Sequence, residues 1–378
     1  MDNNRAGGCS GDVSVNPSAN SFSKKKRNNG SKRRDRLVLE HDFSPKTDPP
    51  DVLTTGELID LLSRRYTDAK TMQSEMFLDA AGYEHSKRYL PNSGVMSLRR
   101  GHDLMLFDIE YQSIVLKYIG LFEIAFRARY AREMAELRGP FAHRDRRNFI
   151  NGDYFNEFLS AYAVELSRAV RNKGPMRDAY EEYGDLPIWK AVEVMTFGTL
   201  SKLYRNTKSG AVKRRVADAF GMDFTKLSSW LRTITTVRNA CAHFSTVARK
   251  KLPSQPAKID NVGISTSNHF YIVLILITLL HENMCFNDDF SLNHDCLLIR
   301  DISELIYERK SAAVDAGIPF NWRHAIIKTC ENIDVNITFN EGSPSIAGRS
   351  TYLSFHGDNG ESIIFGCRVN KKPLHPAA

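Results

Sequence analysis

The sequence is poor in cysteine, and none of its cysteines stands in the closely spaced pairs that zinc sites use. Its six cysteines are scattered, at Cys9, Cys241, Cys285, Cys296, Cys330 and Cys367. Common structural zinc sites require CxxC-type spacing, so we expect neither a metal site of that kind nor another cofactor. Scattered thiols are typical of a reducing compartment, and we therefore expect a cytoplasmic protein.

Long apolar runs are also lacking. The longest, from Phe270 to Leu280, covers 11 residues, which is about half of what a membrane-spanning helix needs. Residues 1–20 are polar and lack the apolar centre of a signal peptide. We expect a soluble protein with no membrane partner, in which the Phe270 run forms a buried helix.

Basic residues are in excess, but the excess is confined to one segment. The chain carries a net charge of +8. Residues 24–36 hold eight basic residues and one acid, a net charge of +7, so the rest of the chain is nearly neutral. The basic residues are Lys24, Lys25, Lys26, Arg27, Lys32, Arg33, Arg34 and Arg36.

This segment lies in a region, residues 1–50, that is rich in Asn, Ser, Gly, Lys and Arg. Such a composition predicts disorder, because too little apolar surface is available to offset the entropy of ordering. A disordered basic arm can bind RNA by releasing counterions. The alternative is a solubilising tail with no defined partner. We favour the interpretation that it binds RNA.

Residues 51–316 show the periodicity of helices. Apolar residues recur at steps of three and four from Phe107 to Leu137, which predicts one long helix ended by Gly139-Pro140. Thr54 or Thr55 can cap an earlier helix. Further helices are expected over 154–172, from Leu186 onward with an interruption or close packing at Gly198, and over 212–220, 226–248, 270–284 and 296–316.

The pattern changes near residue 317. Val335–Phe339 alternates with a period of two, and the segments 352–355 and 362–365 flank a turn-forming tetrad at 357–360. We therefore predict a mainly α protein, a helical bundle with a disordered basic N-terminal tail (1–50), a helical domain (51–316) and a small α/β C-terminal extension (317–378). The strands of the extension would form a small β appendage.

The segment from Val237 to His243 is the most informative for function. On a helix, Asn239 and His243 are four residues apart and share a face. Arg238 lies five residues before His243, about 140° around the axis, and a long arginine side chain can reach across part of that angle. The sequence predicts that both side chains border one groove.

These residue types suit the cleavage of RNA without a metal. A histidine can accept the proton of the ribose 2′-OH or donate one to the leaving 5′-oxygen. A guanidinium can bind a phosphate that gains charge in the transition state, and the Asn239 amide can orient either partner. The products would be a 2′,3′-cyclic phosphate and a 5′-hydroxyl, and DNA would be spared. Spacing alone is a weak signal, and the alternative is an exposed arginine beside a histidine satisfied in the core.

Other polar residues allow two interpretations each. Glu123 and Arg127, four apart on one helix, could support the catalytic histidine or bind phosphate, or could form a structural ion pair. Asp108 could point inward, but a charge near a helix start is the interpretation we favour. The basic cluster Arg144, Arg146 and Arg147 could bind RNA phosphates beside a cleft, or could be solvated surface.

Several further residues are expected to be structural. We expect Trp189, Phe197 and Tyr204 to pack in the core rather than to stack on bases, and the pair Ser201-Lys202 to lie on the solvated side of its helix. Cys241 is expected to be a small buried residue.

The stretch from Phe107 to about Leu252 resembles the Abi-like (abortive infection, AbiD/AbiF-type) family of bacterial anti-phage proteins. The resemblance rests on motifs in the family's order: Phe107-Asp108, Leu121–Arg127, Gly139-Pro140-Phe141, the long block Leu186–Tyr204, Trp230-Leu231, and Val237–His243 followed by Ser245. It covers about 145 residues. Phe244 and Thr246 stand where the family often has a second histidine and an arginine.

The resemblance implies a HEPN-type helical bundle, in which active members place an Arg-x4-6-His motif in a cleft between two such domains. By that likeness Arg238, Asn239 and His243 are the catalytic residues, and a homodimer contributes them from both chains. RNA would be the substrate, and an antitoxin or a regulatory non-coding RNA could be a further partner.

We therefore expect a metal-independent endoribonuclease of abortive infection, a toxin or defence effector. Two other classes stay open. One is a catalytically inactive HEPN module that binds RNA or a partner protein. The other is a nucleic-acid-binding regulator that acts through the basic tail.

Overall fold

The structure is a computed structural model, and it describes residues 53–90, 97–281, 294–333, 335–341, 351–356 and 362–369. Leu53–Ala378 forms one compact unit. The basic segment Lys24–Arg36 and the turn at 357–360 lie outside the described residues.

The fold is mainly helical, as the sequence predicts, and it is built on one long helix, α4 (Leu98–Arg138). The prediction of a helix over Phe107–Leu137 is confirmed, but the helix begins nine residues earlier. Its start is fixed by Asp68, whose carboxylate accepts the N–H groups of Leu98 and Arg99 at 2.7 and 2.9 Å. Ser97 is the local N-cap, and its hydroxyl accepts the N–H of Arg100 at 3.2 Å, whereas the contribution of Asp68 comes from 30 residues away.

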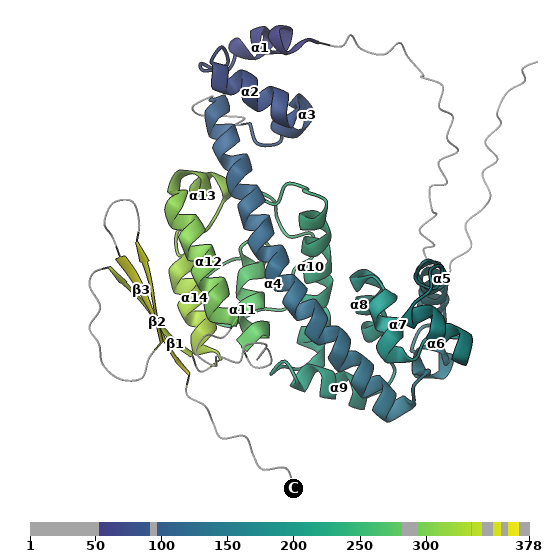
Figure 1. Ribbon diagram of the computed structural model, residues 1–378. Coiled ribbons are helices and arrows are strands. Elements are labelled where there is room, and N and C mark those ends of the chain that lie inside the picture. Colours follow the sequence, from purple (N-terminus) through teal and green to yellow (C-terminus); the bar gives the residue numbers. More distant parts are fainter. Residues whose placement is uncertain are drawn as a thin grey trace, which may run out of the picture. The chain divides into compact units, whose positions relative to one another are not determined.

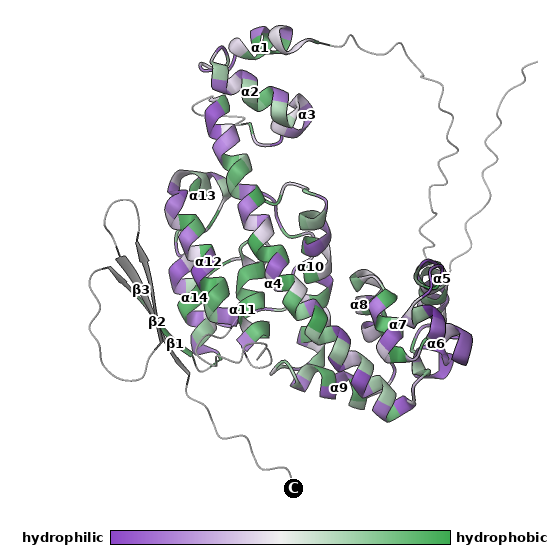
Figure 2. Cartoon of the chain, in the orientation of Figure 1, coloured by the Kyte–Doolittle hydropathy of each residue, from purple (hydrophilic) through white to green (hydrophobic). Residues whose placement is uncertain are grey.

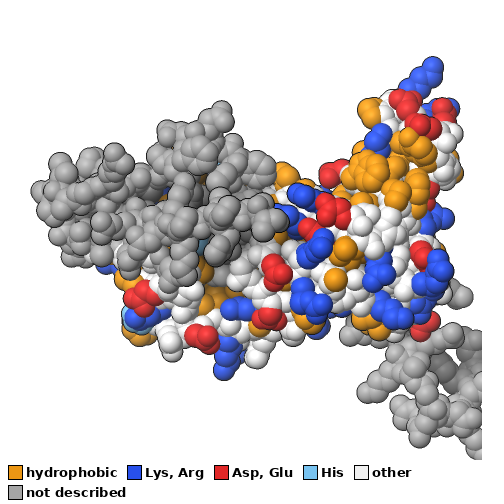
Figure 3. Space-filling view, turned by 90° about the horizontal axis from the view of Figure 1, so that it is seen from below, with side chains coloured by type: hydrophobic (Ala, Val, Ile, Leu, Met, Phe, Trp, Pro, Cys, Tyr) orange, Lys and Arg blue, Asp and Glu red, His pale blue; other side chains and the backbone are white. Residues whose placement is uncertain are grey.

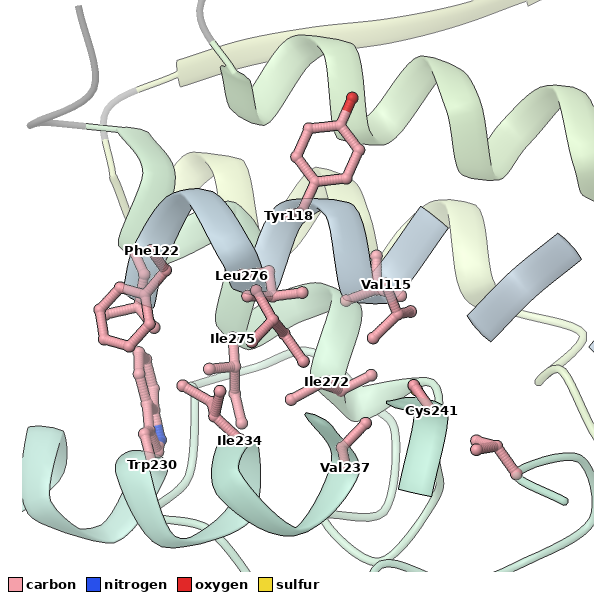
Figure 4. Close-up of a cluster of buried hydrophobic side chains, with 14 of the residues drawn as sticks. Val115, Tyr118, Phe122, Trp230, Ile234, Val237, Cys241, Ile272, Ile275 and Leu276 are labelled. Atoms are coloured by element: carbon pink, nitrogen blue, oxygen red, sulfur yellow. The ribbon is translucent and has the colours of Figure 1, made fainter. Parts of the chain in front are cut away.

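The core lies between α4 and the helices packed along it (Figure 1). These are α10 (Phe224–Ala242), α11 (Tyr271–His281), α12 (His294–Glu308) and α13 (Lys310–Ala316). Helix α11 is apolar along nearly its whole length, and it is buried as expected (Figure 2). Figure 4 shows buried side chains where α4, α10 and α11 meet. They include Val115 and Phe122 of α4, Trp230, Ile234 and Val237 of α10, and Ile272 and Leu276 of α11.

A second group of helices contacts α4 or its neighbours: α7 (Ile188–Val194), α8 (Phe197–Asn206), α9 (Gly210–Asp218) and α5 (Gly152–Ala169). The break that the sequence predicts at Gly198, between two helices, lies at Met195 and Thr196 instead. Helix α7 ends at Val194, Met195 is extended, and the Thr196 side chain caps α8 by accepting the N–H of Thr199. Gly198 lies in the first turn of α8 near Thr235 of α10.

The remaining helical elements are shorter. They are α1 (Thr55–Ser63), α2 (Met72–Ala81), α3 (Tyr83–Ser86), the 3-10 turns η1 (Ala142–Arg144) and η2 (Arg146–Asn148), α6 (Pro175–Tyr183) and α14 (Trp322–Glu331). Of the two candidates for capping α1, Thr54 is the cap: it exchanges hydrogen bonds with Glu57 in a capping box.

Three strands follow the helices: β1 (Val335–Glu341), β2 (Thr351–His356) and β3 (Ser362–Val369). They pair antiparallel in the order β1-β3-β2, with Val335 opposite Val369 and Thr351 opposite Cys367. That this sheet forms an appendage of the helical domain stays a prediction. Within the described ranges, every helix is too short or too polar to cross a membrane.

One buried histidine gives the helical body a predictable response to acid. His143 in η1 is fully buried, its ring stands edge-on to Tyr162 with the ring centres 5.4 Å apart, and neither ring nitrogen has a hydrogen-bond partner among the described residues. Burial lowers the pKa of His143 to about 4. The ring is therefore neutral in the folded protein near neutral pH.

The free energy of unfolding therefore depends on pH through His143. An unfolded histidine takes up a proton below about pH 6.5, whereas folded His143 does so only near pH 4. Stability is thus retained above about pH 6.5 and declines as the pH falls toward 4.

We expect His143 to account for about 2 kcal/mol of stability lost between about pH 7.5 and pH 5. Urea unfolding of His143→Leu should show a smaller loss, while the exposed control His324→Leu should match the parent. If His143→Leu and His324→Leu lose the same amount of stability as the pH falls, His143 is not the origin of the loss.

Candidate functional site

The Arg-x4-His segment lies at the carboxyl end of α10, where the helix gives way to a tight turn. Asp223 starts the helix by accepting the N–H groups of Thr225 and Lys226. The helix ends at Ala242, not near 248 as predicted, because Phe244 adopts a positive φ of 47° and Ser245 donates its N–H to the carbonyl of Ala240 at 2.8 Å. A left-handed conformation costs a bulky residue roughly 1–2 kcal/mol. His243 therefore sits in a well-defined turn at the end of the helix.

All three predicted catalytic residues reach solvent. Asn239 and His243 are exposed, and the Arg238 side chain is 37% exposed. Within the described part of the chain, the side chains of Asn239 and His243 make no hydrogen bond or ion pair. The alternative of a histidine satisfied in the core is therefore wrong.

Arg238 is held in place by an acidic neighbour. Its Nε lies 3.5 Å from Oε2 of Glu123 in α4, and the Glu123 side chain is only 12% exposed. Glu123 also forms an ion pair with Arg127 one turn further along α4. Two guanidinium groups thus share one carboxylate, which leaves a net positive charge at this point.

Arg127 acts as the inner anchor of this group. It donates hydrogen bonds to the backbone carbonyls of Val192 and Met195 at the end of α7, the latter at 2.9 Å. Glu123 and Arg127 form the expected ion pair. Glu123 also contacts Arg238, and neither residue of the pair contacts His243 through a hydrogen bond or ion pair among the described residues. The structure brings Arg238, Glu123 and Arg127 together and leaves Asn239 and His243 outside this network.

Asp108 fixes the chain just after the motif. It is fully buried, so the interpretation as a charge near a helix start is wrong; the helix begins ten residues earlier. Its carboxylate accepts the N–H groups of Val247 and Ala248 at 3.1 and 2.8 Å. Tyr89 and Gln112 donate to it at 2.9 and 2.8 Å. Burial raises the pKa of Asp108, while the four donors act in the opposite direction by stabilising the ionised form.

We expect Asp108→Asn to destabilise the protein by roughly 1–3 kcal/mol, because an amide has one acceptor oxygen and turns its NH2 group toward other donors. Chemical denaturation measures this loss. Asp103→Asn, a change of an exposed residue on the same helix, should leave stability within about 0.5 kcal/mol of the parent. If both variants unfold at the same denaturant concentration as the parent, Asp108 does not hold the turn.

The arginine cluster predicted to bind RNA is used locally. Arg144 pairs with Asp185 at 2.7 Å, Arg147 pairs with Asp145 at 2.8 Å, and Arg146 donates to the carbonyl of Phe149 at 2.6 Å. The cluster follows the carboxyl end of α4, about 22 Å along that helix from Glu123, the partner of Arg238. It is thus not brought to the turn of His243. Figure 3 shows basic and acidic side chains interspersed over one face of the molecule.

The structural expectations for the aromatic residues are partly confirmed. Phe197 and Tyr204 are buried, and so is Cys241, whose pKa burial raises to about 12. Trp189 is 51% exposed, so its assignment to the core is wrong; it follows Ile188 at the start of α7, which turns the opposite face to the core. Ser201 is buried, so the prediction that it lies on the solvated side is wrong; Lys202 is exposed as predicted.

Sequence reasoning missed one group of polar residues. A cavity of about 360 Å³ lies between α8, α10 and the loop that follows, lined by Arg205, Ser228, Ser229, Arg232, Ser254 and Gln255. The only signal available was the spacing of Ser228, Arg232, Asn239 and His243, which places them on one face of α10. No group of three or more His, Cys, Asp or Glu side chains among the described residues could hold a metal ion.

Comparison with known proteins gives one match. No curated protein and no solved structure matches the chain. Residues 64–248, just under half of the chain, match the family model of the Abi-like proteins, and this region includes α4, α10, Arg238 and His243. The match supports the Abi-like family for the part of the chain that carries the candidate site.

Proposed function

We propose that this protein is a metal-independent endoribonuclease of abortive infection, built on a HEPN-type domain with Arg238, Asn239 and His243 at its active site. The observation that carries the proposal is the exposed imidazole of His243 at the end of α10, five residues after Arg238, whose guanidinium Glu123 holds. The match to the Abi-like family suggests a role in abortive infection defence.

The chemistry follows from the residue types. His243 accepts the proton of a ribose 2′-OH, the 2′-oxygen attacks the phosphorus, and the bond from phosphorus to the 5′-oxygen breaks. The leaving 5′-oxygen takes a proton, and the products are a 2′,3′-cyclic phosphate and a 5′-hydroxyl. Arg238 stabilises the negative charge that builds on the phosphate oxygens.

Glu123 and Arg127 serve as positioning residues in this mechanism. Glu123 approaches Nε of Arg238, which leaves the terminal nitrogens of the guanidinium to bind phosphate. Arg127 keeps Glu123 in place through its bonds to the end of α7. A guanidinium that is already oriented loses less entropy when substrate binds.

A second copy of the chain would complete the site. One imidazole cannot accept and donate a proton in the same step, and no hydrogen bond joins Arg238 to His243 within the described residues. Two copies related by a two-fold axis would supply two imidazoles and two guanidiniums, one histidine acting as base and the other as acid. We therefore propose a homodimer with one composite site.

Purified protein should cut single-stranded RNA in the presence of EDTA, and both His243→Ala and Arg238→Ala should lower the rate at least about 100-fold, which is the usual contribution of a general acid-base group or a charge-stabilising donor. Gel analysis of end-labelled RNA measures the rate and identifies the 2′,3′-cyclic phosphate.

The exposed control His324→Ala should cut like the parent, and a DNA strand of the same sequence should stay intact. Loss of cutting with EDTA would point to a metal nuclease. Unchanged phage protection in His243→Ala cells would support instead an inactive module that binds RNA or a partner.

The dimer has a separate test. Co-expression of two differently tagged chains allows isolation of a heterodimer with one parent chain and one His243→Ala chain. If both chains build one site, this heterodimer should lose nearly all activity, because its site lacks one imidazole. A heterodimer that keeps half of the activity of a doubly tagged parent dimer would show that each chain holds a complete site. A monomer in solution would also contradict the proposal.

A further inference from the structure

The cavity between α8 and α10 has a composition that favours anions. Arg205 comes from the last turn of α8, Arg232 and two serines come from α10, and Ser254 and Gln255 come from the loop after α10. No acidic side chain is among the lining residues. A cavity of about 360 Å³ that opens to solvent can hold a phosphate group with part of its ester substituents.

The two arginines of this cavity lack acidic partners. Arg127, Arg144, Arg147 and Arg238 each form an ion pair. Arg205 and Arg232 are exposed, and neither forms an ion pair with any residue that the structure describes. Their charges are therefore not neutralised by the protein, and two guanidiniums lining one cavity attract a phosphate strongly.

Of the serine hydroxyls that line the cavity, that of Ser228 donates to the carbonyl of Phe224 at 2.6 Å, and that of Ser229 adds a donor. Ser229 accepts the N–H of Ala257 at 2.9 Å, and its own O–H donates no hydrogen bond to a described residue. The bond from Ala257 also fixes the loop that carries Ser254 and Gln255 against α10. Ser254 is in turn bonded to Thr233 at 3.1 Å. The cavity is thus held by hydrogen bonds between α10 and the loop.

The position of the cavity links it to the candidate active site. Arg232 and Asn239 are exposed and seven residues apart, so they share one face of α10, and exposed His243 follows four residues later as the C-cap of the helix. Arg232 and His243 are about 16 Å apart along the helix. A stacked strand covers that distance in about five nucleotides at 3.4 Å each.

We propose that Arg205 and Arg232 bind a backbone phosphate of the RNA strand, several nucleotides from the bond that is cut, so that the strand runs along the exposed face of α10. The proposal rests on the function proposed above for its ligand, and it adds a binding site that is separate from the cutting residues. It predicts that RNA binding depends on these arginines even where no cutting takes place.

The test measures binding rather than cutting. Full-length His243→Ala protein and a single-stranded RNA of about 20 nucleotides are used, with fluorescence anisotropy as the readout. Adding Arg205→Gln and Arg232→Gln together should raise Kd roughly 10- to 30-fold at about 0.1 M salt. It should also lower the slope of log K against log salt by about 0.7, because the contact to one phosphate of a single strand is lost.

A matched control removes the same charge elsewhere. Arg171→Gln with Lys173→Gln changes two exposed basic residues after α5, and this variant should bind like its parent. The N-terminal basic tail is present in every variant, so its contribution cancels. Circular dichroism confirms that each variant is folded.

The outcomes separate the two proposals. Weaker binding and a smaller salt slope in the arginine variant support the strand path, even if no RNA is ever cut. Unchanged Kd and slope overturn it, even if the parent protein proves to be a nuclease. If RNA binding is unchanged but thermal stabilisation by inorganic phosphate is lost, the cavity binds a free phosphate and the strand path is likewise overturned.

Discussion

The carboxylate of Asp108 fixes the segment on which the candidate site depends. It is buried in α4 and accepts two N–H groups from Val247 and Ala248, just beyond His243. Before His243, the side chains of Val237 and Cys241 are buried in the core shared with α4 and α11 (Figure 4). The turn is therefore attached to the same core on both sides, and a rigid backbone presents the imidazole to solvent. Burying a carboxylate is costly, and the arrangement is stable because four donors surround it.

The charges of the site are positioned in the same way, from the inside outward. Arg127 is bonded to the end of α7, Glu123 is paired with Arg127, and Arg238 approaches Glu123 with its Nε. Exposure rises along this series, from 11% for the Arg127 side chain to 37% for that of Arg238. An arginine at the surface normally loses considerable side-chain entropy when it binds a ligand. Here the protein has already restricted Arg238 through Glu123, so an anion that bound there would meet a guanidinium that is already oriented.

Much of this could be predicted from local patterns, and the errors share one cause. Apolar spacing revealed α4 and α10, and the order of residue types revealed Arg238 and His243. The start of α4 depends on Asp68 as well as on the local cap Ser97. The role of Asp108 depends on Val247 and Ala248, 139 and 140 residues away along the chain. Trp189 and Ile188 are adjacent apolar residues, and only the packing of α7 decides which one faces the core. Contacts between distant segments leave no periodic signal, so sequence reasoning fails there.

Contacts between distant segments also decide which basic residues keep an uncompensated charge that could attract RNA. Arg147 is close in sequence to Asp145 and is neutralised by it, and Arg144 meets Asp185; a run of arginines is then a local network rather than a free charge. Arg205 and Arg232 are 27 residues apart and form no run, yet they line one cavity without an acid among its residues. Attraction for phosphate depends on charge that the protein leaves uncompensated. Isolated arginines on two packed helices can therefore leave more uncompensated charge than a cluster does, and this is the ground on which we propose a strand path along α10.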